Sequence, residues 1–370
     1  MLPEYMLTYP TVFAVGTNYS IFVPFSEDVI MWVRVGDKVY YDHCNGILRS
    51  NTRMHKVELP MHVLDETKEY TVVYKKMIER LPYFPTSEPE RELTLPFRPV
   101  PHEGDIHIYH IADAHYLLAE PITVGTFFGD DINLLVLNGD IPNYCGEIEN
   151  LNKMCEIASG VTGGRCPVVF ARGNHDTRGM YAEDLPNYIP TMNGRTYYTF
   201  RVGCIWGLLL DCGEDKDDDR EVYGGTICFH QFREEETEYI KQVVANAERE
   251  YAAQGVKHKL VISHIGFTHI SKPPMDIEQE IYDEWSRIVR EDIKPDLLLY
   301  GHYHRVDIVP PGSSFDDRGQ PCTAIIGSKP IYDHENGHSF IGCGITLHED
   351  GSKRIVFNDS NGNICRDEII

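Results

Sequence analysis

The sequence predicts a two-part chain, with a small all-β sandwich over residues 1–98 and an α/β domain over residues 99–370. Three observations lead to this prediction. The chain has 370 residues, more than one hydrophobic core usually organises. The first hundred residues contain short strand-like runs and no helical period of useful length. Beyond residue 105, compact apolar runs alternate with amphipathic helix candidates, the pattern of an α/β fold.

The amino-terminal part is expected to form a β-sandwich of about 90 residues. Its strand candidates, rich in β-branched and aromatic side chains, span residues 19–24, 29–35, 38–41 and 68–74. Gly36-Asp37 is a hairpin signal between two of them. Leu64 precedes Tyr70 at a spacing that resembles the tyrosine corner of fibronectin type III domains. Two prolines within residues 97–101 indicate a linker.

The second part alternates predicted strands with predicted helices. Its strand candidates are residues 105–112, 133–137, 167–171, 205–210, 259–262 and 296–300. Its helix candidates are residues 146–159, 231–253 and 276–291. The second helix is the clearest, because its apolar side chains fall on one face and its charges on the other.

The charge of the chain is strongly negative and unevenly distributed. Residues 1–100 carry 11 basic and 13 acidic side chains, whereas residues 101–370 carry 23 and 44. Such a surface repels the backbone of a nucleic acid, so binding to a long nucleic acid is not expected. It also repels anionic phosphate esters, and local cations would be needed to attract them. Bound metal ions would supply such cations.

Three sequence signals bear on where the protein is located and on the redox state of its cysteines. The start lacks the basic-then-apolar pattern of a secretory signal, and no apolar run approaches the roughly 18 residues that cross a membrane. The ten cysteines contain no C-x-x-C pair. We therefore expect a cytoplasmic protein with reduced thiols and no membrane association.

Five short polar clusters follow predicted strands in a fixed order. They are Asp113-Ala114-His115, Gly139-Asp140, Gly173-Asn174-His175-Asp176, Ser263-His264 and Gly301-His302-Tyr303-His304. Ligands in α/β sheets bind beyond the carboxyl ends of the strands, so these side chains should meet at one rim. Each cluster alone is typical of a helix cap, a turn or a surface histidine. Their joint occurrence after five strands predicts a functional site.

The clusters offer carboxylates, an amide and imidazoles, enough to hold two metal ions about 4 Å apart, as in two-metal phosphoesterases. Imidazole and carboxylate ligands suit Mn, Fe or Zn. The short side chain of Asp140 can approach two cations. His175 adjoins a ligand and could act as a general acid or donate to phosphate, with Asp176 orienting its ring.

For the charged residues near these clusters, both a role at the site and a purely structural role are possible interpretations. Arg172 and Arg178 bracket the third cluster, and Arg178 is the stronger candidate for two hydrogen bonds to a substrate phosphate. Salt bridges to acidic neighbours are the alternative for both. The acidic stretch 211–223 is either a solvated loop or a loop over the site that excludes highly anionic substrates.

The combined set of D-x-H, G-D, G-N-H-D, a single His and G-H-x-H resembles the calcineurin-like metallophosphoesterase superfamily over residues 105–350. The resemblance implies a four-layer αββα sandwich. It also implies one ion held by Asp113, His115, Asp140 and His304, and a second held by Asp140, Asn174, His264 and His302. Asp140 would be shared between them. His175 would lie beside the leaving group.

Two groups within this superfamily differ at the second cluster. Purple acid phosphatases pair an amino-terminal β-sandwich with this type of catalytic domain, and the arrangement here looks similar. They carry a metal-binding tyrosine where this chain has Asn143, with Tyr144 one place later, so a tyrosinate–iron site is not expected. The phosphoprotein phosphatase signature G-D-x-V-D-R-G is broken here, which argues against a protein phosphatase.

The sequence thus predicts a metal-dependent phosphoric ester hydrolase in which a metal-activated hydroxide attacks a small phosphate ester. One alternative is a phosphodiesterase acting on small nucleotides. Another is a non-catalytic adhesion or scaffold protein, which the complete ligand set disfavours. The sequence does not specify the natural substrate or a protein partner for the amino-terminal part.

Overall fold

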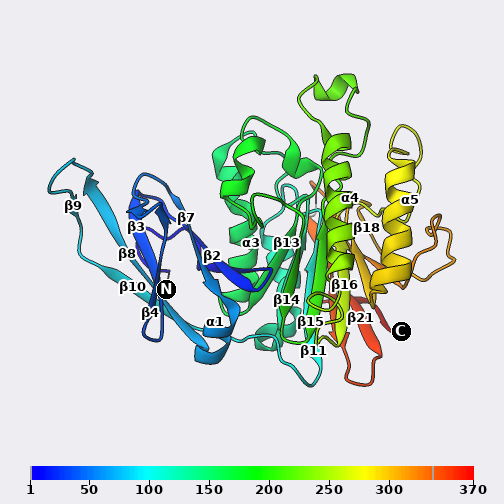
Figure 1. Ribbon diagram of the computed structural model, residues 1–370, viewed down its shortest axis with the longest axis horizontal. Helices are drawn as coiled ribbons and strands as arrows, with labels where there is room; N and C mark the ends of the chain where they lie inside the picture. Colours follow the sequence, from blue (N-terminus) through cyan, green and yellow to red (C-terminus); the bar gives the residue numbers. More distant parts are fainter. Residues whose placement is uncertain (1, 336) are drawn as a thin grey trace.

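Two β-sheets packed face to face, with helices on both outer faces, form the larger part of the chain in the computed structural model, which describes residues 2–335 and 337–370 (Figure 1). The first sheet contains β11 (Ile106–Ile111), β12 (Leu134–Asn138), β13 (Pro167–Ala171), β20 (Ser339–Leu347), β21 (Lys353–Asp359) and β22 (Ile364–Ile369). The second contains β14 (Tyr198–Val202), β15 (Ile205–Leu210), β16 (His258–Ser263), β17 (Leu297–Tyr300), β18 (Arg305–Val309) and β19 (Ala324–Ile331). Strand β19 pairs with both β17 and β20 and so joins the two sheets.

The helices cover the outer faces. They are α2 (Ala119–Gly125), α3 (Lys153–Thr162), α4 (Phe229–Ala245) and α5 (Gln279–Ile288). Short 3₁₀ turns occur at η1 (Thr126–Asp131), η2 (Ile148–Asn152), η3 (His175–Thr177), η4 (Ala182–Asn187) and η5 (Glu221–Tyr223), and a π turn at η6 (Val289–Ile293). Figure 1 shows α4 and α5 on the right of the molecule, away from the blue amino-terminal strands.

Alternate residues of each strand face opposite layers, as the pleat requires. Val136 of β12 packs with Ile262 of the other sheet in the core between the sheets. Its neighbour Leu135 packs beneath α3. Leu208 of β15 faces the other way and packs with Trp285 beneath α4 and α5. The order of layers is therefore helix, sheet, sheet, helix, which confirms the predicted αββα sandwich.

The amino-terminal part forms two further layers of strands. One layer contains β1 (Thr11–Val15), β2 (Asn18–Pro24) and β7 (Met54–Pro60). The other contains β3 (Val29–Val35), β4 (Lys38–Tyr41), β8 (Glu69–Glu79), β9 (Thr86–Ser87) and β10 (Arg91–Pro96), while β5 (His43–Cys44) and β6 (Ile47–Leu48) form a small hairpin and α1 (Met61–Thr67) links β7 to β8. Strand β1 pairs in parallel with β13, so one hydrogen-bonded sheet runs through both parts. The division at residues 98 and 99 stays a prediction.

Local signals predicted ten of the strands and three of the five α-helices in the described part of the chain, but not all of their ends. The strands predicted at residues 167–171 and 205–210 coincide with β13 and β15. The helix predicted to reach residue 253 ends at Ala245, where the side-chain amide of Asn246 donates to the carbonyl oxygen of Gln242. Helix α1 was not predicted, because seven residues are too few to show a helical period.

Tyr70 was expected to form a tyrosine corner within the amino-terminal part. Its buried hydroxyl instead donates to the carbonyl oxygen of Gly164, 2.7 Å away in the turn after α3. The hydrogen bond therefore crosses from the amino-terminal strands to the α/β part. The likeness to a fibronectin type III domain stays a prediction.

Tyr70→Phe should lower the free energy of unfolding by about 1–2 kcal/mol, because it leaves a buried carbonyl without a donor. Chemical denaturation followed by tryptophan fluorescence measures the change. Tyr40→Phe is the matched control, since the Tyr40 hydroxyl makes no hydrogen bond to the described residues and its side chain is half-buried. Equal stability of the two variants would contradict the prediction.

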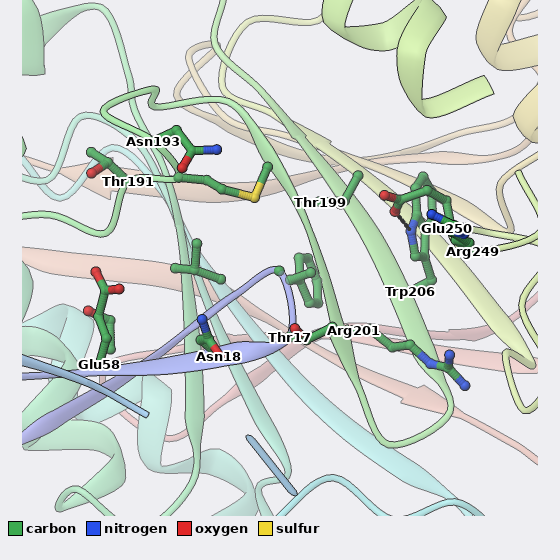
Figure 2. Close-up of a pocket in the computed structure, with 15 residues that line it drawn as sticks. Thr17, Asn18, Glu58, Thr191, Asn193, Thr199, Arg201, Trp206, Arg249 and Glu250 are labelled. Carbon is green, nitrogen blue, oxygen red and sulfur yellow. Dashed lines mark hydrogen bonds between the residues drawn. The ribbon is translucent and has the colours of Figure 1, made fainter. Parts of the chain in front are cut away.

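A cavity of about 350 Å³ lies where the β1–β2 turn meets β14 and β15 (Figure 2). Asn18 and Glu58 line it from the amino-terminal part, and Arg201 lines it from β14. On another wall the indole Nε1 of Trp206 donates to Glu250 Oε2 over 2.8 Å. Its described lining residues include none of the predicted ligands, so it belongs to the junction and not to the rim.

No helix in the described part of the chain is long and apolar enough to span a membrane.

Candidate metal centre

Three glycines of the predicted motifs allow the strand ends to meet. A Cβ atom on Gly139 would lie 2.6 Å from the backbone of Gly173 and 2.6 Å from His264 Nδ1. A Cβ on Gly301 would lie 2.7 Å from Ala112 and 2.8 Å from the same ring nitrogen. Side chains cannot fit at such distances, so the motifs need glycine where β12, β13 and β17 end. The polar clusters that follow these strands are thereby brought together.

The backbone at this rim is held in an unfavourable conformation. Five of the twelve described non-glycine residues with positive φ are predicted ligands. They are Asp113 (56°), His115 (49°), Asp140 (53°), His302 (70°) and His304 (48°). Each such conformation costs roughly 1–2 kcal/mol, and their concentration in one place is typical of a functional site.

Six of the predicted ligands, together with His175, form linked groups whose donor atoms lie within 4.8 Å of one another. These groups are Asp113 with His115 and His304, His115 with Asp140 and His175, and Asp140 with His264 and His302. Asn174 joins the last group, because its Oδ1 lies 3.1 Å from His302 Nδ1. All seven predicted ligands are therefore at one rim.

Asp140 lies between the two outer groups. Its Oδ1 accepts a hydrogen bond from the backbone N–H of His175. Its Oδ2 is 3.1 Å from His264 Nε2, on one side, and 3.9 Å from His115 Nε2, on the other. The carboxylate thus presents one oxygen to ring nitrogens of both groups.

Hydrogen bonds from the surrounding backbone orient the ligands. The Nδ1–H of His264 donates to the carbonyl oxygen of Asn138 over 2.6 Å, which leaves Nε2 as the atom with a lone pair facing the rim. The backbone N–H of His302 donates to Asp113 Oδ1 over 3.0 Å. The side-chain amide of Asn138 in turn donates to Ser263 and Leu299 carbonyls, and so ties the two sheets together beneath the rim.

Several buried ligands at the rim have pKa values far from those of the same side chains in water. Burial raises the pKa of Asp113 to about 8. Burial alone would lower the pKa of His264, but the charge on Asp140 raises it to about 10. Burial would raise the pKa of Asp140, yet His264 and then His175 hold it below its ordinary value. Burial lowers the pKa of His115 to about 3. A cation favours the ionised carboxylates and the neutral imidazoles together.

Unsatisfied atoms test whether these residues fit a metal. Asp113 Oδ2 and His264 Nε2 are buried at the rim without a hydrogen-bond partner. His115 Nε2 and His304 Nε2 face each other at 2.9 Å. A buried polar atom without a partner costs about 1–3 kcal/mol, and a cation bound to the unsatisfied carboxylate oxygen and ring nitrogen would remove that cost. A cation would also give the two facing ring nitrogens a common partner. Carboxylate, amide oxygen and imidazole donors fit Mn, Fe or Zn.

His175 sits beside the ligands with both ring nitrogens engaged. Its Nδ1–H donates to the carbonyl oxygen of Asn143 over 2.8 Å, and its Nε2 accepts from Arg178 Nη1 over 3.0 Å. Asp176 does not contact the ring, in contrast to our prediction. Its Oδ2 accepts instead from the backbone N–H groups of Gly173 (2.7 Å) and Asp140 (3.1 Å), because its buried side chain points beneath the rim. Asp176 therefore holds the two loops together.

A family model described as calcineurin-like phosphoesterase matches residues 102–306. This range is more than half of the chain and includes every predicted ligand. The chain belongs to the calcineurin-like phosphoesterase family. It is a metal-dependent phosphoric ester hydrolase, as predicted, and the family uses divalent metal ions.

Two solved structures have a fold similar to this phosphoesterase. Purple acid phosphatase PPD1 from seeds of yellow lupin (Lupinus luteus) aligns with a TM-score of 0.61 and 14% identity, covering 100% of this chain and 74% of that chain. PhoD aligns with a TM-score of 0.51 and 11% identity, covering 99% of this chain and 93% of that chain. At these identities the likeness concerns the fold alone. It extends over the amino-terminal strands, as the predicted two-part arrangement requires. Among curated proteins, none matches this sequence.

The acidic stretch 211–223 of the phosphoesterase packs against the site, so the solvated-loop interpretation is wrong for its first half. Asp211 and Glu214 are fully buried, and Asp215 is 8% exposed. Asp215 Oδ2 lies 4.0 Å from His302 Nε2. The second predicted interpretation, a loop over the site, agrees with these positions.

The two bracketing arginines differ in orientation. Arg172 Nε lies 2.7 Å from Asp211 Oδ2, and its guanidinium covers the rings of Phe229 and Phe232, so the salt-bridge interpretation holds for it. Arg178 donates from Nε and Nη2 to both carboxylate oxygens of Glu214, over 2.6 and 2.7 Å, and still reaches His175. The salt bridge predicted as the alternative is therefore present for Arg178 too, and it fixes the side chain at the site.

Sequence reasoning missed three residues that support the site. Asn138 orients His264, Asn143 orients His175 through its backbone, and Glu214 fixes Arg178. Asn138 and Asn143 lie within five residues of Asp140, so proximity to a motif was a usable signal. Glu214 lies far along the chain from Arg178, and its acidic neighbours made it look like a surface residue.

Proposed function

We propose that this phosphoesterase holds two metal ions at the rim and hydrolyses a small phosphate ester. Asp113, His115 and His304 would hold one ion, Asn174, His264 and His302 the other, and Asp140 would bridge them. The observation that carries the proposal is the position of Asp140 Oδ2, near ring nitrogens of both groups. When bound, the ions would lower the pKa of a coordinated water toward ~7 and stabilise charge on the transferred phosphoryl group.

Protein side chains would handle the departing alcohol. His175 faces the same cavity as Asp140, Asn174 and His304. Its Nδ1–H is fixed on the Asn143 carbonyl, so any proton for the leaving oxygen has to come from Nε2. Nε2 accepts a hydrogen bond from Arg178 Nη1, and a phosphoryl oxygen entering between the two groups would replace that contact. Arg178 would then donate to the substrate, and His175 would do so in its imidazolium form, which carries a second proton on Nε2.

Removal of the metal is the direct test. Dialysis against a chelator should abolish release of phosphate from p-nitrophenyl phosphate, and added Mn²⁺ should restore it. The chelated protein should also unfold several degrees earlier, since an ion that binds only the folded state stabilises it. Elemental analysis should give about two ions per chain. Activity that survives metal removal, with less than one ion per chain, would exclude the proposal.

The ester class is decided by a second comparison. A phosphomonoesterase should prefer p-nitrophenyl phosphate, whereas a phosphodiesterase should prefer bis-p-nitrophenyl phosphate. We expect the monoester to be preferred. Faster hydrolysis of the bis-ester would favour the alternative, a phosphodiesterase acting on small nucleotides.

A further inference from the structure

A second cavity adjoins the metal centre, and Arg178 lines both. The cavity at the rim has a volume of about 600 Å³ and is lined by predicted ligands together with His175. The second, of about 540 Å³, is lined by residues around Gly179 and by residues 222–227. Arg178 therefore stands between the metal centre and a separate hollow of similar size. We call this hollow the distal cavity.

Arg178, whose side chain is 33% exposed, is held in a fixed position where the two cavities adjoin. Arg178 makes two hydrogen bonds to the buried carboxylate of Glu214. The hydroxyl of Tyr223 donates to Glu214 Oε2 over 3.0 Å and helps to hold this carboxylate in place. Because both partners are held by several bonds, the guanidinium of Arg178 is satisfied toward the distal cavity. Only its Nη1 is directed at His175, on the side of the metal centre.

The distal cavity offers apolar surface and no available cation. Met180 and Val222 line it and are 76% and 74% exposed. The hydroxyls of Thr177 and Thr226 donate to backbone carbonyls and are not free. Glu183 is the one charged side chain of its described lining without an ion-pair partner. An apolar group can enter this cavity, whereas an anionic group would meet a carboxylate and no partner.

The cavity at the rim differs from the distal cavity in the charges that line it. Lys272 lines it and has no ion-pair or hydrogen-bond partner for its side-chain nitrogen among the described residues. Lys216 also lines it, although its Nζ is paired with Asp215 over 2.6 Å. Positive charge available to a phosphate thus lines the cavity at the rim, whereas the distal cavity offers apolar surface without such a charge.

We propose that the distal cavity receives the alcohol part of the substrate and selects alcohols that are apolar and carry no negative charge. The inference rests on the proposed function. In the reaction the oxygen of water bonds to phosphorus, the bond from phosphorus to the ester oxygen breaks, and that oxygen leaves as the alcohol after it takes up a proton. His175 contacts Arg178, so an alcohol that departs beside His175 lies next to the distal cavity.

Two substrates of matched reactivity test the selection. They are 2-phenylethyl phosphate and 2-(4-carboxyphenyl)ethyl phosphate, in which the carboxylate is too remote to change the basicity of the departing alcohol. We expect kcat/KM for the carboxylate substrate to be lower by about tenfold or more, because a like charge placed near Glu183 without a cation is unfavourable. Equal kcat/KM values would overturn the inference.

A matched pair of variants locates the effect. Val222→Lys should raise kcat/KM for the carboxylate substrate and lower it for the neutral one, which reverses or abolishes the preference. Ile78→Lys is the control, since Ile78 is 65% exposed on β8 of the amino-terminal part. The same response from both variants would assign the preference to overall charge and overturn the inference. If p-nitrophenyl phosphate is hydrolysed while the preference is absent, the proposed function stands alone; if neither it nor its bis-ester is hydrolysed, both fail.

Discussion

Asp140→Asn should remove the bound metal and lower kcat roughly a thousandfold, the upper range for loss of one charged stabilising group at an active site. The carboxylate would be replaced by a neutral amide at a position where Oδ2 approaches ring nitrogens of both groups of ligands. Its Oδ1 could still accept the hydrogen bond from the His175 backbone, so the loop should keep its conformation. Elemental analysis and phosphate release measure the two effects.

The control for this variant is another buried aspartate. Asp42 is 3% exposed and pairs with His55 over 2.7 Å in the amino-terminal part. Asp42→Asn changes charge and burial in the same way, but it should leave metal content and kcat unchanged. An Asp140→Asn protein with full metal content and full activity would show that Asp140 is not the bridge.

His175→Ala should retain both metal ions and lower kcat about 100-fold to 1,000-fold. The loss should be larger for an alkyl phosphate than for p-nitrophenyl phosphate, because nitrophenolate departs without needing a proton. His175 has a side chain that is 28% exposed, so its removal should not unfold the protein.

His269→Ala is the matched control for that variant. His269 lines the same cavity and has a side chain that is 23% exposed, but its Nδ1 is paired with Asp317. We expect a change of less than threefold from it, since it contacts none of the predicted ligands. Unchanged turnover of both substrates by His175→Ala would remove His175 from the proposed mechanism.

The ligands could be predicted from sequence because each is encoded locally. A buried strand, a glycine and a polar side chain occur together at Gly139-Asp140 and Gly301-His302, and parallel strands bring such ends to one edge. The same reasoning predicted β13 and β15 with their observed ends. A short motif was thus sufficient to predict a ligand or a strand end where the strand beside it in the sheet carries a similar motif at its own end.

Contacts between distant segments were not predictable in this way. The position of Asp176 beneath the rim depends on two backbone amides that only the folded loops bring near it. The bond of Tyr70 to Gly164 and the pairing of β1 with β13 join parts that the sequence appeared to divide. Strands β20–β22 were not predicted either, because their antiparallel partners could not be read from spacing.

The pairing of β1 with β13 has a consequence for shortened forms of this enzyme. A fragment beginning near residue 99 would leave the outer side of β13 with unpaired backbone N–H and C=O groups. Such an open edge recruits strands from other molecules and leads to aggregation. The amino-terminal strands thus act as a covering for that edge, whatever else they bind.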